Sequence, residues 1–225
     1  IYTVEYPPEL LSSKVLRFGD GYFLSANLSS LALVPPFTIS LWVNEVAGTE
    51  GAPILQSSSI QDPDPTFQFF TDNNGQPGLS QFRFAHWYIP KYLTLGSFHH
   101  LVGVVSNSSI AYYVDGLLVG NITHGGFSPK YEDNPAVYLG ACPLSPHPGM
   151  FQGFIHNVQF YESALSASQV YTLFQRNIWG NPIEEAILIL HWPLNSTLEE
   201  MSDNSLMGGK WFGTAYNGVS YLDDN

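Results

Sequence analysis

Residues 96–120 read GSFHHLVGVVSNSSIAYYVDGLLVG. Two runs within this stretch, 100–106 and 110–114, are rich in β-branched, aromatic and apolar residues, and their alternation predicts two half-buried strands. Asn107-Ser108-Ser109 reverses the chain between the runs, and Asp115-Gly116 supplies the positive-φ pair of a type I′ hairpin turn. The stretch therefore predicts consecutive antiparallel hairpins inside an all-β domain.

The remainder of the chain repeats this pattern of short strands and turns. Further strands are expected at 15–18, 37–43, 66–70, 81–84, 137–140, 154–161 and 187–191. A helix is expected near 166–177, because Ser166 is a suitable N-cap and Val170 and Leu173 begin an apolar stripe. The pattern predicts an all-β fold, a two-sheet antiparallel jelly-roll sandwich with one short helix.

Composition narrows the class of protein. Hydrophobic residues make up 44% of the chain and charged residues only 12%, so the chain can bury a large core. The net charge is −12 and no run of basic residues occurs, which excludes nucleic acid as an expected partner. No segment approaches the roughly 18 apolar residues of a membrane span. We expect 1–225 to form a single domain without such a span.

Three segments resemble a known family. The quoted stretch resembles the central hairpin of laminin G-like domains, in which an aromatic residue and two histidines begin a strand and Tyr-Val-Asp-Gly ends the next. Residues 151–166, FQGFIHNVQFYESALS, resemble the family's last strand, and 15–22 and 35–43 resemble its early strands. The resemblance is to the laminin G-like and concanavalin A-like lectin-glucanase family, and it implies a concanavalin A-like jelly roll.

A fourth segment has an unusual position. Residues 190–204, LHWPLNSTLEEMSDN, resemble the opening strand of such domains but follow the helix. Either the domain is circularly permuted, with 186–225 supplying the family's first strands, or a second, incomplete copy begins here. We favour the permuted domain because a sandwich without that strand would expose apolar edges. A third interpretation is strand exchange, in which these strands complete a neighbour's sheet and the chain self-associates.

The sequence predicts no catalytic residue. Retaining glycan hydrolysis needs two carboxyl groups about 5 Å apart, and no Glu-x-Asp-x-Glu run is present. His99 and His100 are neighbours on a strand and point to opposite faces, which favours structural roles over a shared metal ion.

Calcium is a candidate cofactor, because many members of the family bind it at the sandwich rim through hard oxygen ligands. The candidate ligands here are Asp20, Asp203 and Asn204, although three turn residues without a metal are the simpler interpretation. His156 follows Ile155 where relatives commonly carry an acidic residue, which weakens the transfer of a calcium site. No other cofactor is expected.

Aromatic residues in or near the expected loops are candidates for ligand binding, since sugar rings and protein partners stack on exposed aromatic side chains. The candidates are His86, Trp87, Tyr88, Tyr92, Tyr131 and Trp179. For each of them, core packing or covering of a sheet edge is the competing interpretation.

Four N-glycosylation sequons begin at Asn27, Asn107, Asn121 and Asn195. They favour passage through the secretory pathway and an extracellular or cell-surface location. The leading hypothesis is a non-catalytic binding or adhesion module that recognises glycan or protein ligands. The alternatives are a structural subunit that self-assembles through strand sharing or surface contacts, and a glycan-cleaving hydrolase.

Overall fold

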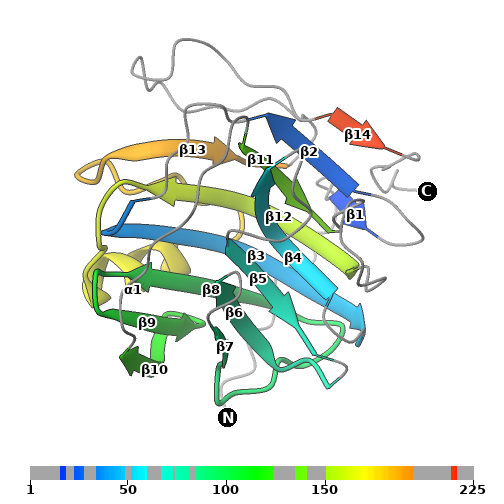
Figure 1. Cartoon of the computed structure of the whole chain (residues 1–225), viewed down its shortest axis with the longest axis horizontal. Coiled ribbons are helices and arrows are strands. Elements are labelled where there is room, and N and C mark those ends of the chain that lie inside the picture. Colours follow the sequence, from blue (N-terminus) through cyan, green and yellow to red (C-terminus); the bar gives the residue numbers. More distant parts are fainter. Residues whose placement is uncertain are drawn as a thin grey trace.

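A computed structural model gives the fold (Figure 1). The structure describes residues 16–18, 23–27, 34–48, 52–59, 67–72, 74–81, 85–123, 135–140, 151–194 and 214–216. These residues form two antiparallel sheets that face each other, and one described helix. The predicted two-sheet sandwich with a short helix is confirmed.

Sheet A has the strand order β1-β12-β3-β8-β9-β10, with β13 also paired to β12. Its strands are β1 (Leu16–Phe18), β3 (Phe37–Ala47), β8 (Phe98–Val105), β9 (Ser109–Val114), β10 (Leu117–Thr123), β12 (Gln152–Tyr161) and β13 (Leu188–Trp192). The quoted stretch thus forms three successive strands of this sheet. Both Asp115 and Gly116 have positive φ, 52° and 74°, as the predicted hairpin turn requires.

Sheet B has the strand order β14-β2-β11-β4-β5-β6-β7. Its strands are β2 (Phe23–Asn27), β4 (Ala52–Ser59), β5 (Phe67–Thr71), β6 (Pro77–Gln81), β7 (Ala85–Tyr88), β11 (Pro135–Leu139) and β14 (Thr214–Tyr216). The strand expected at 81–84 meets β6 only at Gln81, and 82–84 lie outside the described residues.

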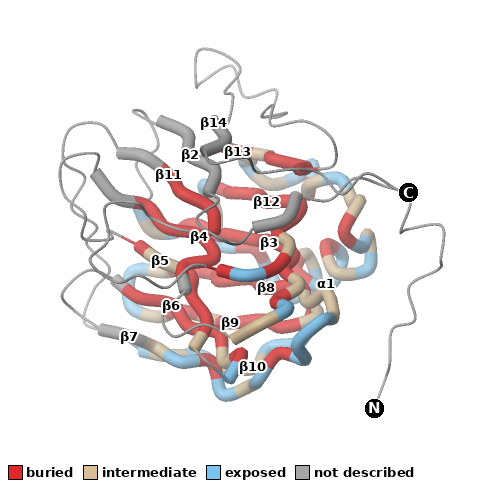
Figure 2. Tube along the Cα trace, turned by 90° about the vertical axis from the view of Figure 1, so that its right-hand side faces the viewer, coloured by how far each residue is buried: buried red, intermediate tan, exposed pale blue. Residues whose placement is uncertain are grey.

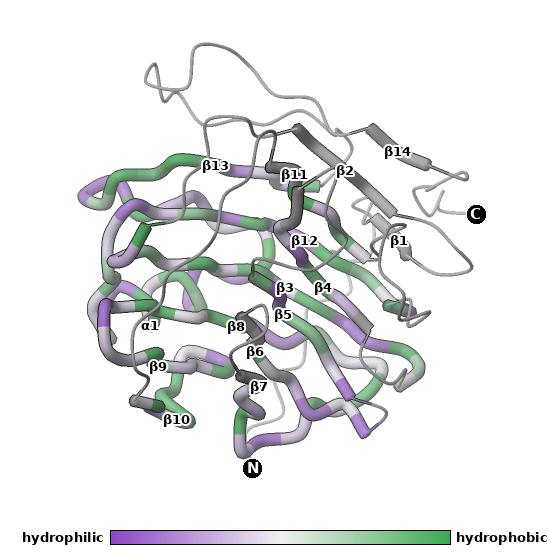
Figure 3. The backbone as a smooth tube through the Cα atoms, in the orientation of Figure 1, coloured by the Kyte–Doolittle hydropathy of each residue, from purple (hydrophilic) through white to green (hydrophobic). Residues whose placement is uncertain are grey.

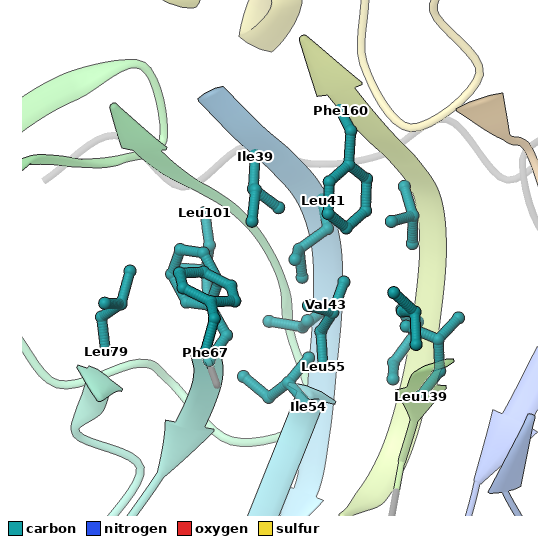
Figure 4. Close-up of a cluster of buried hydrophobic side chains, with 14 of the residues drawn as sticks. Ile39, Leu41, Val43, Ile54, Leu55, Phe67, Leu79, Leu101, Leu139 and Phe160 are labelled. Atoms are coloured by element: carbon teal, nitrogen blue, oxygen red, sulfur yellow. The ribbon is translucent and has the colours of Figure 1, made fainter. Parts of the chain in front are cut away.

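The main core lies between the sheets, because alternate residues of each strand point inward. In β3 these are Phe37, Ile39, Leu41 and Val43, all fully buried, and they meet side chains such as Leu55 and Phe67 from sheet B (Figure 4). Figure 2 shows buried residues running through the centres of both sheets. Figure 3 shows hydrophobic and hydrophilic residues alternating along many of these strands, as expected for half-buried strands.

Helix α1 (Ala167–Gln175) covers part of the outer face of sheet A. Ser166 caps it as predicted: its Oγ accepts a hydrogen bond from the backbone N–H of Gln169, whose Oε1 accepts one from the Ser166 N–H. Val170 and Leu173 of the helix are buried against Val102 and other outward-facing residues of sheet A. Sheet A is therefore buried on both faces where the helix covers it, and β8 reads there as the continuous apolar run 101–105.

The C-terminal region contributes a strand to each sheet. β13 pairs with β12 from Val158 to Tyr161, on the edge of β12 whose earlier residues 153–155 pair with β1. β14 pairs with β2 in sheet B. That 1–225 form a single domain, with 186–225 supplying the family's first strands, stays a prediction. Within the described residues, no helix is long and apolar enough to cross a membrane.

Candidate functional site

The outer face of sheet B carries a row of uncharged polar residues. Cross-strand pairing aligns Tyr138 with Gln56, Gln56 with Gln68, Gln68 with Ser80, and Ser80 with His86. Their neighbours Leu55, Phe69, Leu79 and Leu139 belong to the main core. Since successive strand residues point to opposite faces, Tyr138, Gln56, Gln68 and Ser80 lie on the face turned away from the core. We call these five positions the polar row.

Burial differs along the polar row. Gln56, Ser80 and Tyr138 are buried, whereas Gln68 is half-buried. The Ser80 hydroxyl donates a hydrogen bond of 3.1 Å to Gln68 Oε1, so these two side chains orient each other. Among the row residues whose burial the structure describes, Gln68 on β5 is therefore the accessible one.

An aromatic pair lies beside the accessible end of the row. Tyr88, at the end of β7, is 50% exposed, and its ring meets the ring of Phe70 edge-on at a centroid distance of 5.4 Å. Gly78 makes this arrangement possible, because a Cβ there would lie 2.4 Å from Phe70 Cζ. The missing side chain lets the Phe70 ring lie across β6 and reach Tyr88. Tyr88 therefore presents a supported aromatic surface to solvent.

Tyr92 is the other exposed aromatic of this region, at 59% exposure. It belongs to the segment that leads from β7 to β8. Backbone hydrogen bonds fix this segment: the Ile89 N–H donates to Pro77 O, and the Leu93 N–H donates to Gly75 O. The segment thus runs beside the start of β6, and Tyr92 extends from a backbone that is tied down on both sides.

The other predicted ligand-binding residues have different surroundings. Trp87 is half-buried and packs against the main core. His86 occupies its register position in β7, and Tyr131 lies outside the described residues. Trp179 lies against His156, with ring centroids 4.3 Å apart, next to strands of sheet A. Tyr88 and Tyr92 are therefore the two predicted residues that the structure brings to one exposed region.

His99 and Asp115 act as a structural clamp on the central hairpin. Asp115 Oδ2 lies 2.9 Å from His99 Nδ1, and Asp115 Oδ1 accepts a hydrogen bond from the His100 N–H. The Thr94 N–H donates to His99 Nε2, which fixes the ring's other nitrogen as the donor to the carboxylate. Burial alone would raise the pKa of Asp115, but the His99 bond and nearby charges lower it below its usual value.

His100 points to the opposite face, as expected for adjacent strand residues. Its ring stacks on those of Trp42 and Phe174, with centroids 4.9 Å and 6.3 Å away, and its Nε2 lies 2.8 Å from Ser40 Oγ. Burial lowers the pKa of His100 to about 3, although Asp115 acts in the opposite direction. Both histidines of the family-like motif thus have structural roles in this fold.

A second buried polar cluster surrounds a β-bulge in β12. The register against β3 shifts between His156 and Gln159, and Asn157 there has a φ of 49°. Asn157 Oδ1 accepts hydrogen bonds from Gln159 Nε2 and His191 Nε2. Burial lowers the pKa of His156 to about 3 and that of His191 to about 4. The cluster ties β12, β13 and the residues after α1 together.

The predicted calcium ligands Asp20, Asp203 and Asn204 lie outside the described residues. Within the described part of the chain, no group of three or more His, Cys, Asp or Glu side chains is placed to hold a metal ion. Calcium therefore stays a prediction.

The strands that carry the polar row have no charged residue. The seven strands of sheet B contain no Asp, Glu, Lys or Arg at all. Among the described residues, Glu45 of β3 is buried and accepts a hydrogen bond from Thr71 Oγ1 in β5. The face over β5, β6 and β7 is thus built from amide, hydroxyl and aromatic groups.

The sequon asparagines fall at different places in the fold. Asn107 is exposed in the turn between β8 and β9, and Asn121 is exposed in β10. Asn27 ends β2, and Asn195 lies outside the described residues. Among the sequon asparagines whose burial the structure describes, Asn107 and Asn121 are therefore accessible.

Two facing antiparallel sheets with one described short helix define a jelly-roll β-sandwich. The model of the concanavalin A-like lectin/glucanases superfamily, Laminin_G_3, matches residues 18–171. The chain therefore belongs to this family, and the predicted resemblance is confirmed. A comparison with curated proteins by sequence finds no match.

Solved structures share the fold. A SAP-like pentraxin from Limulus polyphemus superposes with a TM-score of 0.68 at 18% identity, covering 94% of this chain and 95% of the pentraxin chain. A Bacteroides ovatus protein assigned to carbohydrate binding gives 0.70 at 15% identity, covering 93% of this chain and 59% of that one. Domain 4 of the arabinanase AbnA from Geobacillus stearothermophilus, in complex with arabinotriose, gives 0.51 at 22% identity, covering 62% and 68%.

Proposed function

We propose that the protein is a non-catalytic, extracellular glycan-binding module whose site is the outer face of sheet B over β5, β6 and β7. The observation that carries this proposal is the polar row beside the exposed Tyr88. The half-buried Gln68, oriented by the hydrogen bond from Ser80, brings to this face an amide of the kind that pairs with sugar hydroxyls. The Tyr88 ring offers a face on which a sugar ring can stack.

The similar structures support this proposal. One is assigned to carbohydrate binding, and another, the arabinanase domain, is in complex with arabinotriose. The uncharged strands of sheet B fit a ligand that is recognised by hydroxyl groups rather than by charge. In this proposal Tyr92 borders the site, and the ligand lies across the strands along the polar row.

The same strands support a binding role over hydrolysis. Retaining glycosidases place two carboxyl groups about 5 Å apart, and inverting ones about 6.5–9.5 Å apart. The strands of sheet B contain no carboxyl group, and the buried Glu45 of β3 accepts a hydrogen bond from Thr71. The hydrolase alternative therefore has no support from the described residues.

We propose that the protein passes through the secretory pathway and acts outside the cell. The four sequons support this location. A module there would serve adhesion or glycan recognition, with calcium as a candidate cofactor. Self-assembly is the competing function. Light scattering measures it directly, because a monomer of 24.9 kDa excludes it.

A glycan array probed with and without calcium tests the proposal. We expect binding to a restricted set of glycans, and calcium dependence would place a metal at the site. Each glycan that binds is then incubated with the protein and analysed by mass spectrometry, and we expect it to remain intact. Binding to no glycan overturns the proposed function, and shortened products overturn its non-catalytic part.

A further inference from the structure

Strand β10 is the terminal strand of sheet A and presents apolar side chains to solvent. Among the described strands it pairs with β9 alone, and its sequence, LLVGNIT, contains no charged residue. Leu117 is 61% exposed and Leu118 is 56% exposed. Terminal strands of this kind are prone to pair with another chain unless charge, proline, a bulge or a cover prevents it. The bulge between Leu118 and Gly120 interrupts the strand only near its start.

The register places the sequon of β10 on the same face as Leu118. Leu118 pairs with Tyr113, Asn121 pairs with Ala111, and Thr123 pairs with Ser109. Tyr113 and Ala111 belong to the cluster on the outer face of sheet A, beneath α1. Directly paired residues share a face, so Leu118, Asn121 and Thr123 all lie on this outer face.

The sequon is also presented in an accessible form. Asn121 and Thr123 are both exposed, while Ile122 between them pairs with the buried Ile110 and packs against the main core. An extended strand places residues two apart on one side, so the amide and the hydroxyl of the sequon face solvent together. Leu118 precedes Asn121 by three residues, which is about 10 Å along a strand.

We infer that Asn121 carries an N-linked glycan that covers Leu118 and the edge of β10 and so prevents pairing of this edge with a second copy of the chain. The inference rests on the secretory location in the proposed function. The co-reactant is a lipid-linked oligosaccharide diphosphate. A bond forms between the sugar C1 and Asn121 Nδ2, the bond from C1 to the diphosphate oxygen breaks, the amide loses one proton, and the lipid diphosphate leaves.

The test is secretion of the full chain from cultured animal cells, followed by peptide mass spectrometry and light scattering after size exclusion. Thr123→Ser keeps the sequon, and we expect an occupied Asn121 and a monomer. Thr123→Ala removes the sequon, and we expect an unmodified Asn121 and a concentration-dependent dimer. Asn107→Gln is the matched control, because it removes a second exposed sequon asparagine, which lies in the turn between β8 and β9 and not on β10, and we expect it to leave the monomer unchanged.

Two further measurements distinguish loss of the glycan from misfolding of the Thr123→Ala variant. Enzymatic deglycosylation of the folded wild-type protein should produce the same dimer as Thr123→Ala. Adding Leu118→Lys to Thr123→Ala should restore the monomer, because charge at an exposed edge opposes pairing. An unmodified Asn121 in the secreted wild type, or a monomer after deglycosylation, overturns the inference. Glycan-array binding by the same preparations reports separately on the proposed function.

Discussion

Acid is expected to destabilise the fold well above the pH at which carboxylates titrate, because buried histidines on the outer face of sheet A are held neutral. Burial lowers the pKa of His100 and of His156 from 6.5 to about 3. The unfolded chain therefore binds protons between pH 6.5 and pH 3 that the folded chain excludes. Stability is complete above pH 6.5 and is lost as the pH falls toward 3.

The magnitude follows from these values. Lowering the pH from 7 to 5 reduces the free energy of unfolding by about 2 kcal/mol for each of the two histidines, and so by about 4 kcal/mol for the pair. His191, lowered to about 4, adds to the loss in the same direction. Domains typically have only about 5–15 kcal/mol of stability in total, so the loss is large enough to measure.

Urea unfolding at pH 7, 6 and 5, followed by tryptophan fluorescence at constant ionic strength, measures this loss. His100→Phe keeps a ring against Trp42 and Phe174 but removes one titrating group. We expect its stability to fall by about 2 kcal/mol less than that of the wild type over this range. A wild-type stability that does not change from pH 7 to pH 5, or an identical pH dependence in His100→Phe, would refute the reasoning.

Three other substitutions test separate parts of the structure. Gly78→Ala forces the Phe70 ring off β6 and should cost about 1–3 kcal/mol in chemical denaturation, and an unchanged midpoint would contradict the close packing. Asp115→Ala leaves His99 Nδ1 without its acceptor and should cost about 2–3 kcal/mol in thermal unfolding, with Asp115→Asn falling in between. Ser166→Ala removes the helix cap and should cost about 1 kcal/mol, whereas no loss would show that the cap is dispensable.

The central strands could be predicted from the sequence because their residues alternate without interruption. The strands expected at 37–43 and 110–114 correspond to β3 and β9, and the helix expected at 166–177 corresponds to α1. The strands β2, β4, β7, β10 and β14 were missed, and β6 was matched only at Gln81. β4 begins with Ala52-Pro53, carries a bulge and ends in serines, and the bulge in β10 breaks its alternation.

The candidate site could be predicted only in part. Exposed aromatics near a turn identified Tyr88 and Tyr92. The polar row could not be found, because it joins residues from β4, β5, β6, β7 and β11 whose alignment depends on strand register. Register is set by turns and by packing of the opposite face, which short-range sequence patterns do not encode.

The most direct test of the central claim compares two tyrosines of similar exposure on different parts of the fold. Tyr88 is 50% exposed beside the polar row of sheet B, and Tyr171 is 46% exposed on α1, against sheet A. Calorimetric titration with a glycan identified on the array should show about tenfold weaker binding for Tyr88→Ala and wild-type affinity for Tyr171→Ala. Equal affinity of the two variants, or loss of binding in Tyr171→Ala alone, would contradict a glycan site on the outer face of sheet B.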